Sequence, residues 1–286
     1  MKIGVCAIVK NENLYLREWT EHYIALGFDK IILYDNNDPG GEIPEQVIFD
    51  YVLSGKVDII RWNKPANDMG AHNNNQMEAY NNCIQRYKSF DWIAFFDCDE
   101  FLHLEHHTNI HDLFNEYGDK YNQFNEILIS WMIMGDPNSL FYENRPMKER
   151  FQIHLQGAYT DPEINGDDCF KSIIKPASDV RFVFHSHSTN TNIACCATGL
   201  KCYIYYNGPT TFIKPIHKVM WLDHYYTKSL TEYLTKSIRS HHRYYHNESS
   251  LDTCINQYKC FNGWSDKHEE VFRHILKANI KNPSLT

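Results

Sequence analysis

Strand-like and helix-like segments alternate through the first half of the chain, and this alternation constrains the fold more than any other feature. Runs rich in β-branched and aromatic residues lie at 3–9, 30–34, 57–62 and 92–96. The intervals between them carry helical patterns; in the first interval, apolar residues recur three and four positions apart, at Leu16, Trp19 and Tyr23. This alternation predicts an α/β fold with a largely parallel central sheet flanked by helices.

The second half of the chain differs in character. A further strand is expected at 126–131, the stretch 135–168 is rich in loop formers, and residues 227–281 have helical patterns with many charged and aromatic side chains. We therefore expect an α/β domain over residues 1–226 and a helical C-terminal extension over 227–286 that packs on it.

A carboxylate pair follows the most apolar of the expected strands. Residues 92–96 are apolar without alternation, as in a central strand covered on both faces, and Asp97 and Asp99 come directly after. Ligands of open α/β sheets bind at this carboxyl edge. Two such carboxylates suit one hard cation, Mn²⁺ or Mg²⁺, that keeps positions open for phosphate oxygens. The alternative is a surface turn whose acids cap the next helix, and an Asp-x-Asp motif alone leaves both interpretations open.

Three histidines are candidates to complete such a site. His185 and His187 lie two apart after a strand-like segment, so they would face the same side of it. His224 opens a polar run that continues to Lys228 and Ser229, ahead of a helix whose amino end attracts anions. Each feature has a structural alternative: hydrogen-bonded histidines in the first case, and Ser229 as a helix N-cap beside a solvated Lys228 in the second.

Further polar residues fall at strand ends and helix starts, where a nucleotide can lie across the sheet edge. These are Lys10, Asp35, Asn37 and Gln76. Their chemistry suits base and ribose hydroxyls, although each one alone also fits a cap or a turn.

Several short motifs occur in a fixed order over residues 3–243. They are Val9-Lys10-Asn11-Glu12, Glu18-Trp19 with His22, Leu26-Gly27, Tyr34-Asp35-Asn36-Asn37, Asp91-Trp92-Ile93-Ala94-Phe95, Asp97-Cys98-Asp99-Glu100-Phe101, Trp131 with Met134-Gly135, Glu149-Arg150-Phe151, Lys171-Ser172-Ile173-Ile174 with Pro176 and His185, and His224-Tyr225 with Lys228-Ser229. In order and spacing this series resembles GT-A-type glycosyltransferases, in particular the family 2-like group and its family 92 relatives.

The resemblance implies a nucleotide-sugar donor, an Mn²⁺ or Mg²⁺ ion, and transfer of the sugar to a hydroxyl of a saccharide or glycolipid acceptor. The implied donor-binding residues are Lys10, Glu12, Asp35, Asn37, Gln76, Asp97, Cys98 and Lys228. The implied metal ligands are Asp97, Asp99, His185 and His224. Cys98 is not counted among these ligands, because a thiolate is a soft ligand. The resemblance also divides the α/β domain into a nucleotide-sugar half, about 1–104, and an acceptor half, about 105–226.

An inverting transfer also needs a base for the acceptor hydroxyl. Glu149 is the first candidate, because it lies in the family-like Glu-Arg-Phe, and Asp161 is the second; Asp136 and Asp168 are further carboxylates of the loop-rich segment. An ion pair with a neighbouring arginine is the structural alternative for Glu149. Met134-Gly135-Asp136 departs from the Phe-Gly-Ser that relatives often have, which leaves acceptor specificity open.

Composition limits the partners and the cellular compartment that we expect for this chain. The formal charge of -8 disfavours nucleic acid as a partner. The nine cysteines show no Cys-x-x-Cys spacing and fit a reducing cytoplasm. No apolar run approaches the roughly 20 residues that a bilayer needs, so any membrane association is expected to be peripheral. A cytoplasmic enzyme of surface-polysaccharide synthesis fits these properties and the resemblance.

Two other functions remain open. A phosphohydrolase of the HAD type also places Asp-x-Asp after an apolar strand, although it does so after its first strand, whereas Asp97 and Asp99 follow the fourth. A non-catalytic sugar-binding protein on the same fold is the second, since fold does not determine function.

Overall fold

The computed structural model describes residues 1–65, 69–155, 166–183, 186–191, 193–207, 210–244 and 248–281. Two units are distinguished by their internal contacts. Unit 1 comprises Met1–Ala66, Gly70–Trp131 and Asp167–Asp223; unit 2 comprises Asn67–Met69, Met132–Gly166 and His224–Thr286. No helix in the described part of the chain is long and apolar enough to cross a membrane.

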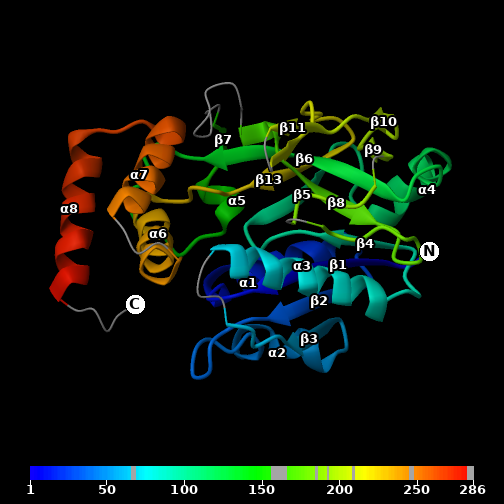
Figure 1. The fold of residues 1–286 in the computed structure, drawn as a ribbon, viewed down its shortest axis with the longest axis horizontal. Coiled ribbons are helices and arrows are strands. Elements are labelled where there is room, and N and C mark those ends of the chain that lie inside the picture. The colour runs from blue at the N-terminus through cyan, green and yellow to red at the C-terminus, as the bar shows by residue number, and fades with distance from the viewer. Residues whose placement is uncertain are drawn as a thin grey trace. The chain divides into compact units, whose positions relative to one another are not determined.

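Unit 1 is built on the parallel strands that the sequence predicts. They are β1 (Ile3–Val9), β2 (Lys30–Asp35), β3 (Val57–Arg61) and β4 (Trp92–Phe95), in the order β3-β2-β1-β4 (Figure 1). The connecting helices are α1 (Asn13–Ala25), α2 (Glu45–Leu53) and α3 (Met69–Arg86). Val9 lies opposite Asp35 and Cys6 opposite Phe95, so the carboxyl ends of three strands meet at one edge.

Beyond β4 the sheet is mixed. β8 (Phe170–Ile174) runs antiparallel between β4 and β6 (Glu126–Gly135), and β9 (Ala194–Cys196) and β10 (Lys201–Cys202) complete the order. Further elements are helix α4 (Ile110–Tyr121), the 3-10 helix η1 (Gly166–Asp168), and four short strands. Strand β5 (Glu100–Leu104) pairs with β13 (Met220–His224), and β11 (Tyr205–Asn207) pairs with β12 (Thr210–Phe212) in an antiparallel sheet of their own. The predicted α/β class is confirmed, and the antiparallel position of β8 is what the sequence pattern did not show.

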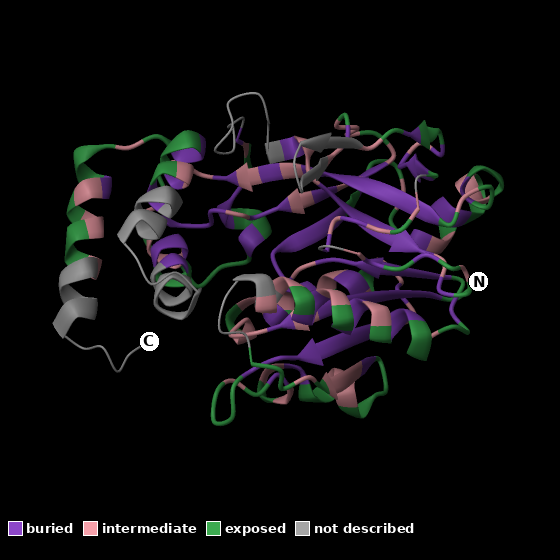
Figure 2. Cartoon of the chain, in the orientation of Figure 1, coloured by how far each residue is buried: buried purple, intermediate pink, exposed green. Residues whose placement is uncertain are grey.

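The central strands are buried, as their continuous apolar sequences require. All four residues of β4 and all five of β8 are buried (Figure 2). One core cluster packs α3 against β1, β2 and β4, with Cys6, Tyr34, Tyr80, Ile84 and Phe95 among its members. The sheet edge therefore rests on a rigid support.

Unit 2 holds the end of β6, the short elements α5 (Met147–Arg150) and β7 (Ile153–His154), and the helices α6 (Leu230–Tyr244), α7 (Glu248–Asn262) and α8 (Asp266–Lys281). Helices are thus present over the C-terminal region, where the sequence pattern predicts them. Their shared core includes Leu230, Leu234 and Tyr258, with Trp264 and Phe272 packed against it.

Gly27 ends α1 in a conformation that other residues avoid. Its φ is +85°, and a Cβ here would lie 2.4 Å from the side-chain amide nitrogen of Asn109. The Asn109 side chain is the N-cap of α4, because it accepts a hydrogen bond from the His111 N–H. We expect Gly27→Ala to lower the free energy of unfolding by about 2–3 kcal/mol, from left-handed strain and loss of the cap. Gly55→Ala is the matched control, because Gly55 has φ +74° with nothing near its Cβ. Equal losses for the two variants in urea titrations would contradict the cap contribution.

Glu126 is a buried acid at the start of β6. Its carboxylate accepts hydrogen bonds from Ser172 Oγ at 2.7 Å and Thr189 Oγ1 at 2.8 Å, yet burial raises its pKa to about 7. Since the native chain keeps this proton to a higher pH than the unfolded chain, the contribution of Glu126 to unfolding free energy falls by about 3 kcal/mol as pH rises from about 4.5 to 7.

We therefore expect Glu126→Gln to remove that part of the pH dependence, so that wild type and variant differ most above pH 7. Urea titrations at pH 5 and pH 8 measure the difference, with the exposed Glu270→Gln as control. A wild-type and variant pair whose stabilities change in parallel between the two pH values would contradict the prediction.

Candidate functional site

The Asp97–Glu100 turn is held in place by helix α1. The Glu100 N–H donates to Asp97 O at 3.1 Å, and the Asp97 N–H donates to Glu100 Oε2 at 2.8 Å. Trp19 Nε1 and Tyr23 OH both donate to the Glu100 carbonyl oxygen, at 3.1 and 2.9 Å. Because both aromatic residues are fully buried, the acidic turn after β4 has a fixed position.

Asp97 accepts hydrogen bonds on both carboxylate oxygens. Lys171 Nζ donates to Oδ2 at 2.7 Å, while Gln76 Nε2 and Tyr80 OH donate to Oδ1 at 2.9 and 3.2 Å. The Lys171 side chain is 0% exposed, whereas the Asp97 side chain is 35% exposed. The structure thus brings together two residues that the sequence selected, Gln76 and Asp97, and places a buried ammonium behind the second.

The pKa values show how the charges are balanced. Burial acts to raise the pKa of Asp97, but the adjacent Lys171 ammonium outweighs it and the pKa is lowered. Burial also acts to lower the pKa of Lys171, and the charges of Asp97 and Glu100 raise it instead. For Glu100, burial prevails and its pKa is raised well above the usual value; its carboxylate lies 3.8 Å from Lys171 Nζ. The shifts of Asp97 and Lys171 both favour the charged forms of this pair, whereas the shift of Glu100 favours its protonated form.

His187 is the histidine that the structure associates with this cluster. Its charge is among the influences that lower the pKa of Asp97, and its Nδ1 lies 2.6 Å from the Phe170 carbonyl oxygen. An Nδ1–H donated to that carbonyl leaves Nε2 as the basic ring atom. His185 lies outside the described residues, and His224, buried at the end of β13, belongs to unit 2.

A second polar cluster lies at the ends of β1 and β2. The Asp35 carboxylate accepts hydrogen bonds from the Asn37 backbone N–H at 3.0 Å and its side-chain amide at 2.7 Å, and it pairs with Arg61. Lys10 Nζ pairs with Asp38 at 2.9 Å. The sequence-predicted Asp35 and Asn37 thus form one turn, which fixes the loop at the carboxyl edge.

Two further residues that the sequence selected, Glu12 and Cys98, lie at the start of α1 and in the acidic turn. Glu12 precedes α1, and its carbonyl oxygen accepts the Tyr15 and Leu16 N–H bonds at 2.9 Å. Cys98 is buried within the acidic turn.

The donor set fits a hard cation that takes most of its ligands from phosphate and water. Asp99 is 5% exposed and lies two residues past Asp97, whose oxygens already accept three hydrogen bonds. Among the residues that the structure describes, no group of three or more His, Cys, Asp or Glu side chains is arranged to hold a metal ion. One or two carboxylates are nevertheless the usual protein contribution to an Mg²⁺ site that includes substrate phosphates.

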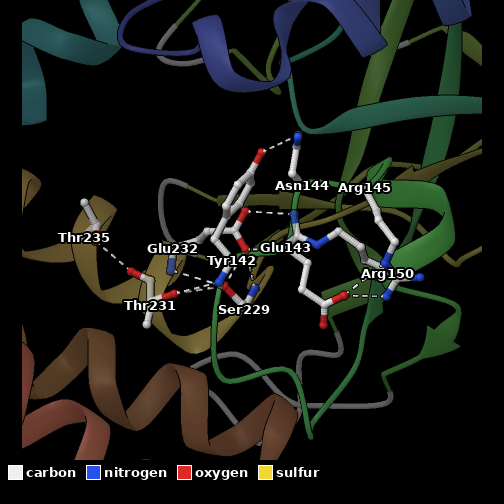
Figure 3. Close-up of polar contacts among 9 residues, drawn as sticks. All are labelled: Tyr142, Glu143, Asn144, Arg145, Arg150, Ser229, Thr231, Glu232 and Thr235. Atoms are coloured by element: carbon white, nitrogen blue, oxygen red, sulfur yellow. Dashed lines mark hydrogen bonds and ion pairs between the residues drawn. The ribbon is translucent and has the colours of Figure 1, made fainter.

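The polar run before α6 has a structural role. Ser229 is the helix N-cap: its N–H donates to Glu232 Oε2 at 3.2 Å and its Oγ accepts the Glu232 N–H at 3.4 Å, which is a capping box (Figure 3). The N-cap interpretation of Ser229 is therefore correct. The other part of that alternative, a solvated Lys228, is wrong, because Lys228 is 4% exposed. Its backbone has a φ of +50°.

The same Glu232 pairs with Arg150 (Figure 3), so the arginine next to Glu149 is not the ion-pair partner that the structural alternative for Glu149 requires. The Arg150 guanidinium also lies 5.0 Å from the Tyr142 ring centroid and 4.5 Å from that of Phe151. Glu149 itself is exposed on α5. Asp161 lies outside the described residues.

Sequence reasoning assigned no role to Lys171 or Tyr80. Lys171 interrupts the otherwise apolar and hydroxyl-bearing segment Phe-Lys-Ser-Ile-Ile of β8, and a lone lysine in a buried strand is a signal for a buried acid nearby. Tyr80 lies four residues after Gln76 on α3, so both side chains reach the same carboxylate from one helix face.

Comparison with known proteins identifies a family whose model matches this chain. The model of glycosyltransferase family 92 matches residues 2–195, more than half of the chain. A family 92 protein of Oryza sativa subsp. japonica is 28% identical over 117 residues, which are 41% of this chain and 18% of that protein. A galactan beta-1,4-galactosyltransferase of Arabidopsis thaliana is 28% identical over 105 residues, 36% of this chain and 21% of the relative. The chain thus aligns with about a fifth of the length of these relatives.

Among solved structures, S. aureus TarS residues 1–349 align with a TM-score of 0.39 and 9% identity, covering 91% of this chain and 72% of TarS. A TM-score this low does not by itself establish a shared fold.

Proposed function

This chain belongs to glycosyltransferase family 92, and from that premise we propose that it transfers a sugar from a nucleotide-sugar donor to a hydroxyl of a saccharide or glycolipid acceptor. The observation that carries the proposal is the acidic turn Asp97–Glu100 at the carboxyl edge of the parallel strands, anchored by α1 and backed by Lys171. This is the edge at which α/β folds bind nucleotides.

The donor's leaving group is a nucleoside diphosphate, so negative charge grows on its phosphates as the glycosidic bond breaks. A bound Mn²⁺ or Mg²⁺ would neutralise that charge, and Asp99 with Asp97 would be its protein ligands. Gln76, Lys10, Asp35 and Asn37 line the same edge, where the donor's base and ribose are proposed to bind.

On the acceptor side, Glu149 is proposed as the base that removes the hydroxyl proton, with Asp161 as the second candidate. An inverting course follows from a base that activates the acceptor for direct displacement at the anomeric carbon. His224 and His185 are the proposed histidine ligands, and Lys228 is the proposed basic residue facing the diphosphate.

The donor sugar is proposed to be a hexose carried by UDP. The relative named as a galactan beta-1,4-galactosyltransferase makes UDP-galactose the first donor to test and a β-linked galactose oligomer the first acceptor. A cytoplasmic site of action and a role in surface-polysaccharide synthesis complete the proposal.

Release of UDP from a panel of UDP-sugars, with and without sugar acceptors and Mn²⁺, tests the proposal. We expect one donor to be consumed faster when an acceptor is added. Hydrolysis of a generic aryl phosphate in place of sugar transfer would favour the phosphohydrolase interpretation, and sugar binding with no UDP release from any donor would favour the binding protein.

A further inference from the structure

Lys171 is a buried basic group that contacts the acidic turn directly. It lies on β8, a strand whose five residues are all buried, and its side chain has no exposed surface. An ammonium ion without solvent is costly unless acids surround it, and here Asp97 lies 2.7 Å and Glu100 3.8 Å from Nζ. The sheet brings this lysine beneath the turn because β8 pairs with β4, placing Ser172 opposite Phe95.

The two ends of the Lys171–Asp97 pair face different surroundings. Lys171 is fully buried, while about a third of the Asp97 side chain is exposed. Asp97 therefore carries its charge at the surface of the sheet edge with its counter-ion beneath it. Its position is constrained on the other side by Gln76 and Tyr80, which donate to the second oxygen.

We propose that Lys171 is a positioning residue for donor binding: its ammonium fixes the Asp97 carboxylate at the sheet edge and offsets the negative charge that an incoming diphosphate meets. This inference rests on the proposed function. Lys171, Gln76 and Tyr80 hold the Asp97 carboxylate in place, while about a third of that side chain stays exposed and can act with Asp99 as a ligand of the divalent cation. A purely structural Lys171 would affect stability and leave the affinity for nucleotide unchanged.

Isothermal titration of UDP in the presence of Mn²⁺ separates the two roles. Lys171→Met keeps the length of the side chain without its charge, and we expect it to weaken UDP binding by about 10- to 100-fold, as for other groups that act through a ligand residue. Lys171→Arg, which keeps the charge, should recover part of that loss. Lys175→Met is the matched control: it removes a lysine that follows the same strand and donates to Asn122 O at 3.0 Å, so binding should stay within about threefold.

Thermal melting of each variant checks that it is folded. If Lys171→Met does not fold, Lys171→Gln, which keeps a hydrogen-bond donor for Asp97 without the charge, is titrated instead. Folded Lys171 variants that bind UDP as tightly as wild type would overturn the inference and leave the proposed function intact. Wild-type protein that binds no nucleotide with Mn²⁺ would overturn the proposed function and the inference with it.

Discussion

Replacing Asp99 with asparagine is expected to lower sugar transfer at least about 100-fold and to abolish its stimulation by Mn²⁺. The variant keeps the size of the side chain and removes the charge that a hard cation requires, whereas groups acting only indirectly on a metal already cost 10- to 100-fold. Asp99 lies in a turn fixed by α1, so the loss reflects the ligand and not a displaced loop. Initial rates over a range of Mn²⁺ concentrations measure the effect.

Cys98→Ser is the control for this prediction, because Cys98 is the neighbour of Asp99 in the same turn. Its rate should stay within about twofold of wild type, since a thiol is a poor ligand for an oxygen-preferring metal. An equal loss in both variants would contradict the assignment of oxygen ligands and point to a general disturbance of the turn.

Glu232→Ala is expected to lower the stability of unit 2 by about 3–5 kcal/mol. The side chains of Glu232 and Arg150 are 6% and 2% exposed, so removing one leaves the other as a buried charge without its partner. The change also removes the capping box that Glu232 forms with Ser229 at the start of α6. Urea titrations followed by tryptophan fluorescence report this loss, because Trp264 packs against the same core.

Arg145→Met is the matched control in the same segment (Figure 3). Arg145 pairs with Glu143 at 2.6 Å, but both side chains are more than half exposed, and an exposed ion pair contributes at most about 1 kcal/mol. Similar losses for Arg145→Met and Glu232→Ala would contradict the importance of burial. A milder loss for Glu232→Gln, which keeps an acceptor for the Ser229 N–H, would separate capping from charge.

The parallel half of the fold could be predicted from the sequence because its signals are local. Each strand of β1 to β4 is a short apolar run, and each helix between them has apolar residues at helical spacing. The position of β8 could not be predicted in this way. It lies between β4 and β6, and no local pattern states which strand a segment will join or in which direction.

The candidate site was predictable to the same degree. Asp97 and Gln76 were selected because both lie at the carboxyl edge, and the structure joins them by a hydrogen bond of 2.9 Å. Lys171 was missed because it is 74 residues away along the chain and reaches Asp97 only through the pairing of β8. The alternative of a solvated Lys228 rested on the usual exposure of lysine, whereas the turn before α6 buries this one.

Thermal melting of the wild-type chain with UDP, GDP and CMP, each with and without Mn²⁺, tests most directly whether the sheet edge is a donor site. A ligand that binds only the folded state raises the melting temperature by mass action. We predict a rise with UDP that requires Mn²⁺ and is absent in Asp99→Asn. No rise with any nucleotide, or a rise with UDP that is the same without Mn²⁺ and in Asp99→Asn, would contradict a metal-dependent nucleotide-sugar site at Asp97 and Asp99.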